Sequence, residues 1–243
     1  MVINQFNLIE GISIFNESNL IAGFHTHPAL EIIIAKNGDC FTLSTKNVVL
    51  KNIQFGIVKA NIHHSLNAEN CDCDIIMMDA EYLDSAKLLN SFGQKNDNSE
   101  IFSIDNNSKK IISNDSLLEF CNEKNQSKLD DRIINCLQFI KKNITAKEIP
   151  LVDLSKEVNL SQSRLSHLFK EQIGVSIQNY IVWTRMKIAV NYMINNKMHL
   201  TDAAYHAGFY DSAHFSRHFK KMFGVKPSLV YNNSIIVQGF EKE

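Results

Sequence analysis

The chain has 243 residues, of which 44% are hydrophobic, nine are glycine and three are proline. This composition is sufficient for two ordinary domains with real cores, and it excludes a collagen-like or largely disordered protein. The net charge of −1 hides two unequal halves: residues 1–127 carry nine basic and 16 acidic side chains (−7), and residues 128–243 carry 16 and 10 (+6). A basic C-terminal half favours contact with a polyanion.

No apolar run reaches the ~18 residues that a membrane span needs. The N-terminus also lacks a basic segment followed by an apolar one, so the sequence predicts no signal peptide. We therefore expect a cytoplasmic protein without a membrane partner, whose thiols are reduced. The cysteines are odd in number and irregularly spaced, which argues against a disulfide framework; they are Cys40, Cys71, Cys73, Cys121 and Cys136.

The first 80 residues or so have the pattern of short β-strands. β-branched or alternating runs occupy residues 30–35, 40–50, 53–58 and 73–78, and Asn37-Gly38 supplies a hairpin turn signal. Short strands separated by tight turns are typical of a small barrel or sandwich.

The pattern changes to helical spacing at residues 82–92, where Tyr82, Leu83, Ala86 and Leu89 would share one face. That helix could either pair two subunits or cover an open edge of the barrel. Beyond it the sequence predicts a polar loop with one short strand at 93–110, a helix at 111–121 and a linker at 122–128. We accordingly expect one domain at 1–127 and a second at 128–243.

The second domain reads as helical throughout. Asp130 and Asp131 favour a helix start, and an apolar stripe follows from Ile133 to Ile140. Further helices are predicted at about 151–157, 161–172, 176–195, 200–206 and 211–223.

This domain contains an internal repeat with an offset of 50 residues. Ser161–Lys170 aligns with Asp211–Lys220, and Gly174 aligns with Gly224. Each copy opens on a helix-capping residue, has apolar side chains four residues apart, and ends in glycine. Each also follows a shorter helix and a turn residue that tolerates positive φ, Asn159 or Gly208. Two tandem helix-turn-helix units are therefore predicted.

The outer face of each second helix would enter a major groove, because it carries donors and cations suited to base edges and phosphates. These DNA-binding candidates are Gln162, Ser163, Arg164, Ser166, His167 and Lys170 in the first unit, and Ser212, His214, Ser216, Arg217, Lys220 and Lys221 in the second.

Over about 100 residues the chain resembles the AraC/XylS family of bacterial transcription regulators. The residues that carry the resemblance are Ala203-Ala204, Gly208-Phe209, Asp211-Ser212, Phe215-Ser216-Arg217, Phe219-Lys220-Lys221, Gly224, Pro227-Ser228 and Tyr231, with Arg185 and Ala189 in the preceding helix. Two positions depart from the family pattern. His167 stands where arginine is frequent, which predicts weaker guanine reading by the first unit at neutral pH. Asn232 stands where arginine is usual, which removes a possible phosphate or structural contact.

The resemblance implies a domain that inserts both recognition helices into successive major grooves of double-stranded DNA. It also implies a transcription activator that acts with RNA polymerase and forms a homodimer. Carried over by position, the base readers would be Ser163, Ser166 and His167, and Ser212, His214, Ser216 and Arg217. The implied fold class is α+β, with an N-terminal cupin-like barrel and flanking helices before an all-α domain.

The N-terminal half contains a histidine motif. His25-x-His27-x3-Glu31-x6-Gly38 matches the first cupin motif, and His63 or His64 with Asn67 falls where the second would lie. The set His25, His27, Glu31 and His64 is thus a candidate effector pocket or metal site. A simpler interpretation is that these are polar residues at the rim of the barrel, and we expect no cofactor beyond such a metal. The pair Cys71 and Cys73 is spaced too closely for a structural zinc pair.

The leading functional hypothesis is therefore a transcription regulator, and not an enzyme, whose barrel senses a small molecule or dimerises. Two alternatives stay open at this point. The chain could be a metal-dependent cupin enzyme fused to a DNA-binding tail, or its N-terminal half could act by protein contacts alone.

Overall fold

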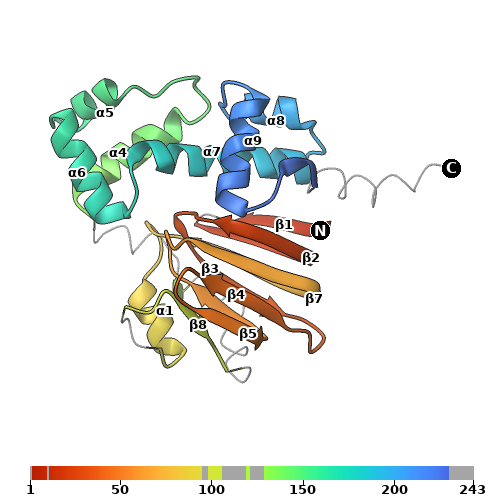
Figure 1. The fold of residues 1–243 in the computed structure, drawn as a ribbon. Coiled ribbons are helices and arrows are strands. Elements are labelled where there is room, and N and C mark those ends of the chain that lie inside the picture. Colours follow the sequence, from red (N-terminus) through yellow and green to blue (C-terminus); the bar gives the residue numbers. More distant parts are fainter. Residues whose placement is uncertain (1, 10, 95–97, 106–118, 121–128, 230–243) are drawn as a thin grey trace.

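A computed structural model describes residues 2–9, 11–94, 98–105, 119–120 and 129–229, without the side chains of residues 2–9. The N-terminal part is a near-closed antiparallel β-barrel and the C-terminal part is helical (Figure 1). The strands are β1 (Val2–Ile9), β2 (Ile12–His25), β3 (Ala29–Ala35), β4 (Phe41–Thr45), β5 (Val49–Ile53), β6 (Phe55–Val58), β7 (His64–Asp79) and β8 (Ile101–Ser103). The helices are α1 (Ser85–Ser91), α4 (Asp131–Lys142), α5 (Leu151–Glu157), α6 (Gln162–Ile173), α7 (Ile177–Ile194), α8 (Leu200–His206) and α9 (Ser212–Phe223).

The two longest strands, β2 and β7, form the centre of the sheet, whose order is β1-β2-β7-β3-β6-β8. β4 pairs with the first part of β7 and with β5. The sequence pattern predicted β3, β6 and the last third of β7, and it merged β4 with β5. It missed β1 and β2, and it missed residues 64–72 of β7, because the polar positions of these long strands break the alternation.

α1 packs on the barrel through Leu88 and Leu89, which are buried with strand residues such as Phe55 and Phe102. The predicted helix began too early and its expected apolar face was partly wrong, since Ala86 is exposed. Two roles were considered for this helix, pairing two subunits and covering the barrel. Its packing against the barrel agrees with the second role. The predicted helix at 111–121 and the linker at 122–128 lie almost entirely outside the described residues.

The predicted helices of the C-terminal half are confirmed to within one or two residues. The expected caps are also present: Ser161 accepts a hydrogen bond from the Arg164 amide, and Asp211 accepts one from the His214 amide. Gly174 and Gly224 end α6 and α9 in the left-handed conformation, with φ of 83° and 71°. Local chemistry therefore defines both recognition helices.

The two inter-helix turns use the residues that the repeat indicated. Asn159 has a φ of 52° between α5 and α6, and Gly208 has a φ of 87° between α8 and α9. A Cβ atom on Gly208 would lie 2.9 Å from Nε of Arg185 and from the Ile144 carbonyl oxygen. The buried Arg185 donates to that carbonyl, so this turn has no room for a side chain.

The barrel and the helical part share one apolar core. Phe15 and Ala22 of β2 lie in the same buried cluster as Met186 of α7 and Phe219 of α9. Figure 1 shows α7 and α9 lying across the β1–β2 end of the barrel. No helix among the described residues is long and apolar enough to cross a membrane.

Candidate nucleic-acid interface and candidate metal centre

The first recognition helix, α6, presents most of its predicted DNA-binding residues to solvent. Gln162, Ser163, Arg164, His167 and Lys170 are exposed, and Ser166 is half-buried, whereas Leu165 and Phe169 face the core. Glu171 lies 3.7 Å from His167 in an exposed ion pair. This carboxylate lowers the positive charge at the end of the helix.

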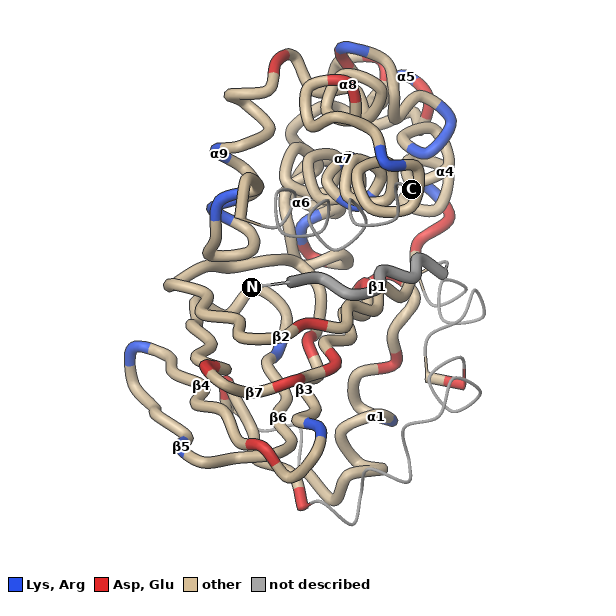
Figure 2. The backbone as a smooth tube through the Cα atoms, turned by 90° about the vertical axis from the view of Figure 1, so that its right-hand side faces the viewer, with Lys and Arg blue, Asp and Glu red and all other residues tan. Residues whose placement is uncertain are grey.

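In the second recognition helix, α9, the cations are the most accessible of the predicted residues. Arg217, Lys220 and Lys221 are exposed, and Ser212, His214 and Ser216 are half-buried. The His214 ring packs edge-to-face against His218, with ring centroids 4.6 Å apart, and against Phe209. His214 is thus more constrained by packing than the sequence suggested. Figure 2 shows basic positions on α9 and acidic positions on the barrel strands below it.

Two exposed tyrosines flank these helices and were missed by the sequence analysis. Tyr210, immediately before the cap of α9, is 81% exposed, and Tyr205 of α8 is 64% exposed. A phenolic hydroxyl beside a helix N-terminus can donate to a DNA phosphate. The sequence could have identified Tyr210 by its position, directly before the capping residue Asp211.

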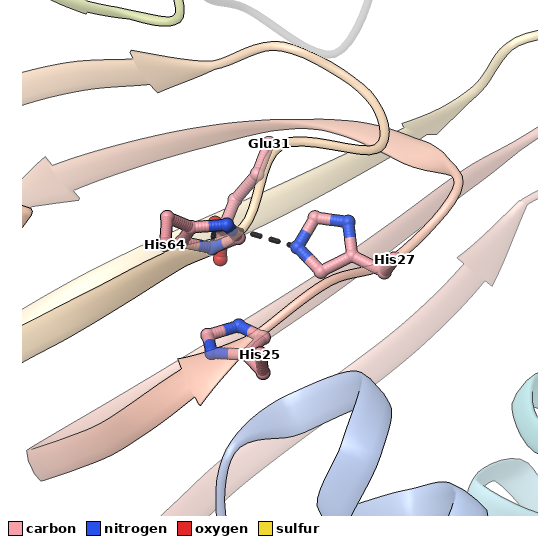
Figure 3. Close-up of side chains that lie close together, drawn as sticks. All are labelled: His25, His27, Glu31 and His64. Carbon is pink, nitrogen blue, oxygen red and sulfur yellow. Dashed lines mark ion pairs between the residues drawn. The ribbon is translucent and has the colours of Figure 1, made fainter. Parts of the chain in front are cut away.

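In the barrel, the four predicted residues of the histidine motif meet in one buried cluster (Figure 3). His25 ends β2, His27 lies in the following loop, Glu31 lies in β3, and His64 begins β7. One potential ligand atom from each side chain lies within 4.8 Å of all the others. His63 and Asn67, also considered, are exposed and take no part.

The histidine rings have a fixed orientation. Nδ1 of His25 bonds to the Gly23 carbonyl at 2.8 Å, that of His27 to the Ala29 carbonyl at 3.0 Å, and that of His64 to the Ile62 carbonyl at 2.9 Å. A carbonyl can only accept, so each Nδ1 carries the proton and each Nε2 of a neutral ring offers a lone pair. This is the arrangement that second-shell carbonyls impose on metal-binding histidines.

The carboxylate completes the set. Oε2 of Glu31 lies 3.0 Å from Nε2 of His64 and 3.6 Å from Nε2 of His27. Ligand atoms about 2.1 Å from a tetrahedral ion are separated by roughly 3.4 Å. Apart from these contacts with one another, the three atoms have no hydrogen-bond partner among the described residues. Three imidazoles and one carboxylate therefore fit a first-row transition metal better than Ca²⁺ or Mg²⁺, which prefer oxygen ligands.

The electrostatics of the cluster differ between its histidines. Burial lowers the pKa of His64, but the contact with Glu31 outweighs it and raises this pKa, so an ion would have to displace a proton there. Burial, together with the neighbouring His64 and His27, lowers the pKa of His25 to about 3, so this ring is neutral. Burial alone would raise the pKa of Glu31, but the contacts with His27 and His64 outweigh it and hold the pKa well below its usual range. By contrast, burial raises the pKa of the Cys73 thiol, which makes it a poor source of thiolate.

A cavity of about 30 Å³ adjoins the cluster on the side of the helices. Glu17, His25 and Glu31 line it together with apolar side chains of β2, β7, α7 and α9. The carboxyl of Glu17 is buried, which raises its pKa to about 8. This space holds one or two water molecules and is too small for an organic effector in the conformation described.

A near-closed barrel is followed by two helix-turn-helix units, and this second arrangement is typical of DNA-binding domains. Residues 154–232 match the family described as a helix-turn-helix domain. The arabinose operon regulatory protein of Escherichia coli (strain K12) is 32% identical over 111 residues, which are 46% of this chain and 38% of that protein. The C-terminal part of the chain is therefore a helix-turn-helix domain similar to part of that regulator, and the chain spans less than half of the regulator's length.

Two further comparisons extend over both parts of the chain. The probable transcriptional regulator LumQ of Photobacterium leiognathi is 24% identical over 232 residues, which cover 84% of this chain and 90% of that protein. A structure of ToxT from Vibrio cholerae has a TM-score of 0.57 at 18% identity and covers 90% of this chain and 96% of that one. The likeness to ToxT shows that the fold is shared.

Proposed function

We propose that the protein is a sequence-specific transcription regulator whose α6 and α9 read two neighbouring major-groove segments on one face of double-stranded DNA. The observation that carries this proposal is the duplication itself. Both units have a side-chain N-cap, a turn residue with positive φ and a glycine stop, and both leave a polar, basic face in solvent. Two plain helical hairpins would not need two such faces.

Within this proposal, the base-reading residues are Ser163, Ser166 and His167 of α6, and Ser212, His214, Ser216 and Arg217 of α9. The phosphate contacts come from Lys170, Lys220 and Lys221, with Gln162 and Arg164 at the start of α6. Base contacts set specificity, whereas phosphate contacts set affinity and register. A regulator of this kind acts in the cytoplasm, on chromosomal DNA.

Selection of bound sequences from a random DNA pool tests the proposal. Two half-elements centred about 10 base pairs apart are expected, because adjacent major grooves on one face of DNA have that spacing. Recovery of one short element would mean that only one unit reads DNA. Recovery of no enriched sequence by the full chain would overturn the proposed function.

We propose, from the roles of its relatives, that the protein activates transcription. The lactose operon transcription activator of Staphylococcus xylosus is 31% identical over 100 residues, and we extend the role of activator to this chain. We also propose that the protein contacts RNA polymerase. Transcription in vitro from a promoter bearing the selected element should rise when the protein is added. A fall would make it a repressor.

We further propose that the barrel carries the signal and that the protein forms a homodimer. A domain that shares an apolar cluster with α7 and with the second helix-turn-helix unit can alter the placement of that unit when it binds a small molecule. Analytical ultracentrifugation of the full chain tests the dimer, and a purely monomeric result at micromolar concentration would refute it.

A further inference from the structure

We infer that the cluster of His25, His27, Glu31 and His64 binds one divalent transition-metal ion, and that this ion sets the position of both recognition helices on the barrel. DNA binding would then respond to metal. The inference rests on the proposed function, because its output is DNA affinity. It assigns the signal to an ion and the response to defined contacts between the two parts of the molecule.

An ion accounts for the buried polar groups of the cluster better than a plain barrel rim does. All four side chains are at least 96% buried, and His64 is fully buried. Buried polar atoms in native proteins are nearly always paired, and leaving several unpaired at one point is costly. Here Nε2 of His27, Nε2 of His64 and Oε2 of Glu31 converge without other partners among the described residues. A cation at that point would satisfy all of them together.

The metal could reach the cluster from the seam between the barrel and the helices. A crevice on this seam is lined by Thr26, His27 and Asn61 of the barrel and by His218 and Lys221 of α9. One wall therefore includes residues 26–28, the segment that carries the ligand His27. The other wall belongs to the second recognition helix, so the site lies where the two parts meet.

The segment that carries His25 and His27, at the end of β2 and in the following loop, is bonded to the end of α9. The Gly23 amide donates to the Gly224 carbonyl at 3.3 Å, and the Thr26 amide donates to the Lys221 carbonyl at 3.2 Å. These donors flank His25 on both sides. Any displacement of His25 toward an ion is therefore transmitted to the last turn of the second recognition helix.

The first recognition helix has a corresponding contact. Asn61 lies three residues before His64, and its amide donates to the His27 carbonyl at 2.9 Å. Its side-chain amide donates to the carbonyl of Gly174, the glycine that ends α6, at 3.4 Å. The glycine stops of both helices thus rest on the segments that supply the ligands.

A third connection reaches the helix between the two units. The His27 ring stacks on the indole of Trp183 in α7, with centroids 6.0 Å apart and planes inclined by 26°. Together these contacts join the four ligands to α6, α7 and α9. A bound ion holds residues 23–27 and 61–64 to one point, and this would favour one placement of the two reading helices over others.

The first experiment measures metal binding by the full chain after removal of metal with a chelator. Zn²⁺ and Co²⁺ are the probes, with stoichiometry determined by elemental analysis after dialysis. One ion per chain is expected, with loss in His64→Ala and in Glu31→Gln and retention in His63→Ala. His63 is the matched control, since it is adjacent in sequence but exposed and stacked on Phe24. Circular dichroism of the metal-free variants verifies folding, and His25→Gln replaces any variant that is unfolded.

The second experiment tests the coupling. Trp183 is the chain's single tryptophan, so its fluorescence reports on the seam and should be quenched by Co²⁺ in the wild type and in His63→Ala, but not in His64→Ala. The dissociation constant for the selected DNA should change at least about fivefold between metal-free and Zn²⁺-loaded protein, the lower end of ordinary allosteric coupling. His64→Ala should not respond to Zn²⁺.

The possible outcomes separate this inference from the proposed function. DNA binding that is normal in metal-free protein, with no stoichiometric metal uptake, overturns the inference and leaves the regulator intact. Metal uptake with unchanged DNA affinity overturns the coupling. An equal Zn²⁺ response in His64→Ala would place the effect elsewhere, for example at the neighbouring His214 and His218 of α9. Failure to bind any DNA, with or without metal, would instead refute the proposed function.

Discussion

The indole nitrogen of Trp183 in α7 donates a 2.7 Å hydrogen bond to the carboxylate of Asp79, the last residue of β7, and both residues are buried. Asp79 is also paired with Lys187, one helical turn further along α7. Because a buried carboxylate needs all of its partners, this bond ties the helix between the two reading units to the end of β7.

Replacement of Trp183 by phenylalanine should lower the free energy of unfolding by about 1.5–3 kcal/mol, the usual value of a hydrogen bond to a charged group. Denaturant titration followed by circular dichroism measures the change. Tyr192→Phe, an aromatic substitution on the same helix but only half-buried, should have a much smaller effect. Equal losses in both variants would show that the Asp79 bond contributes nothing specific.

Stability should also depend on pH through Glu81. Burial, and next the charge of Asp79, raises the pKa of Glu81 to about 7, although Lys187 and a 2.7 Å hydrogen bond from the Tyr180 hydroxyl oppose the shift. A raised pKa in the folded state means that the folded protein binds the proton more tightly than the unfolded chain. The contribution of Glu81 to stability is therefore greatest at low pH and is lost as the pH rises from about 4.5 to about 7.

The substitution Glu81→Gln tests this dependence. Glutamine can still accept from Tyr180 but cannot ionise, so the thermal midpoint should rise relative to the wild type at pH 8 and stay nearly equal at pH 5. Glu157→Gln, on an exposed position of α5, is the control and should shift neither value. A higher thermal midpoint for the wild type than for Glu81→Gln at pH 8 would contradict the raised pKa of Glu81.

The seam itself can be tested with a pair of matched glycines. Gly224→Ala and Gly174→Ala each place a side chain in a left-handed helix stop, at a cost of about 1–2 kcal/mol. A Cβ atom on Gly224 would also lie 2.9 Å from Nδ1 of His25 and would overlap the Gly23 backbone. A Cβ atom on Gly174 meets only the flexible Asn61 side chain, at 3.4 Å.

Gly224→Ala should therefore destabilise the protein more than Gly174→Ala, and it should accelerate limited proteolysis between the barrel and the helices. The rate of cleavage at native temperature measures the opening of the seam. Similar cleavage rates in Gly224→Ala and Gly174→Ala would mean that α9 and the segment carrying His25 and His27 separate readily even in the wild type.

Arg217 is the exposed arginine of the second recognition helix, and we expect its base contact to contribute to specificity. Arg217→Ala should weaken binding to the selected DNA by about 1–3 kcal/mol and relax the preference at one base position. Competition between DNA sites that differ at single positions measures both effects. Unchanged affinity and preference would remove Arg217 from the base-reading set.

Lys220 is expected to contact phosphate rather than a base. Lys220→Ala should weaken binding to all sequences alike and reduce the slope of log affinity against log salt by about one unit. Binding isotherms at several salt concentrations give that slope. Lys156→Ala, an exposed lysine at the end of α5, provides a comparison for the general effect of charge. A loss of specificity without a change in slope would indicate a base contact instead.

The sequence by itself determined the parts of this protein that depend on local chemistry. Helix caps, left-handed turn residues and glycine stops act within a few residues, so the six described C-terminal helices and their repeat could be predicted from the pattern alone. The motif from His25 to Glu31 and His64 was also visible, because the ligand types and their spacing are properties of the chain.

The tertiary structure alone decided what long-range pairing controls. β2 and the first half of β7 carry interrupted patterns and pair with each other across about 40 to 60 residues of chain, and β1 is held in a hairpin against β2, so no local signal defined them. His64 belongs to the cluster and His63 does not, because successive residues at the start of β7 face opposite sides of the sheet. The seam that joins the ligand loops to Gly174, Trp183 and Gly224 exists only after both parts have folded, because it is built from contacts between residues more than 100 positions apart.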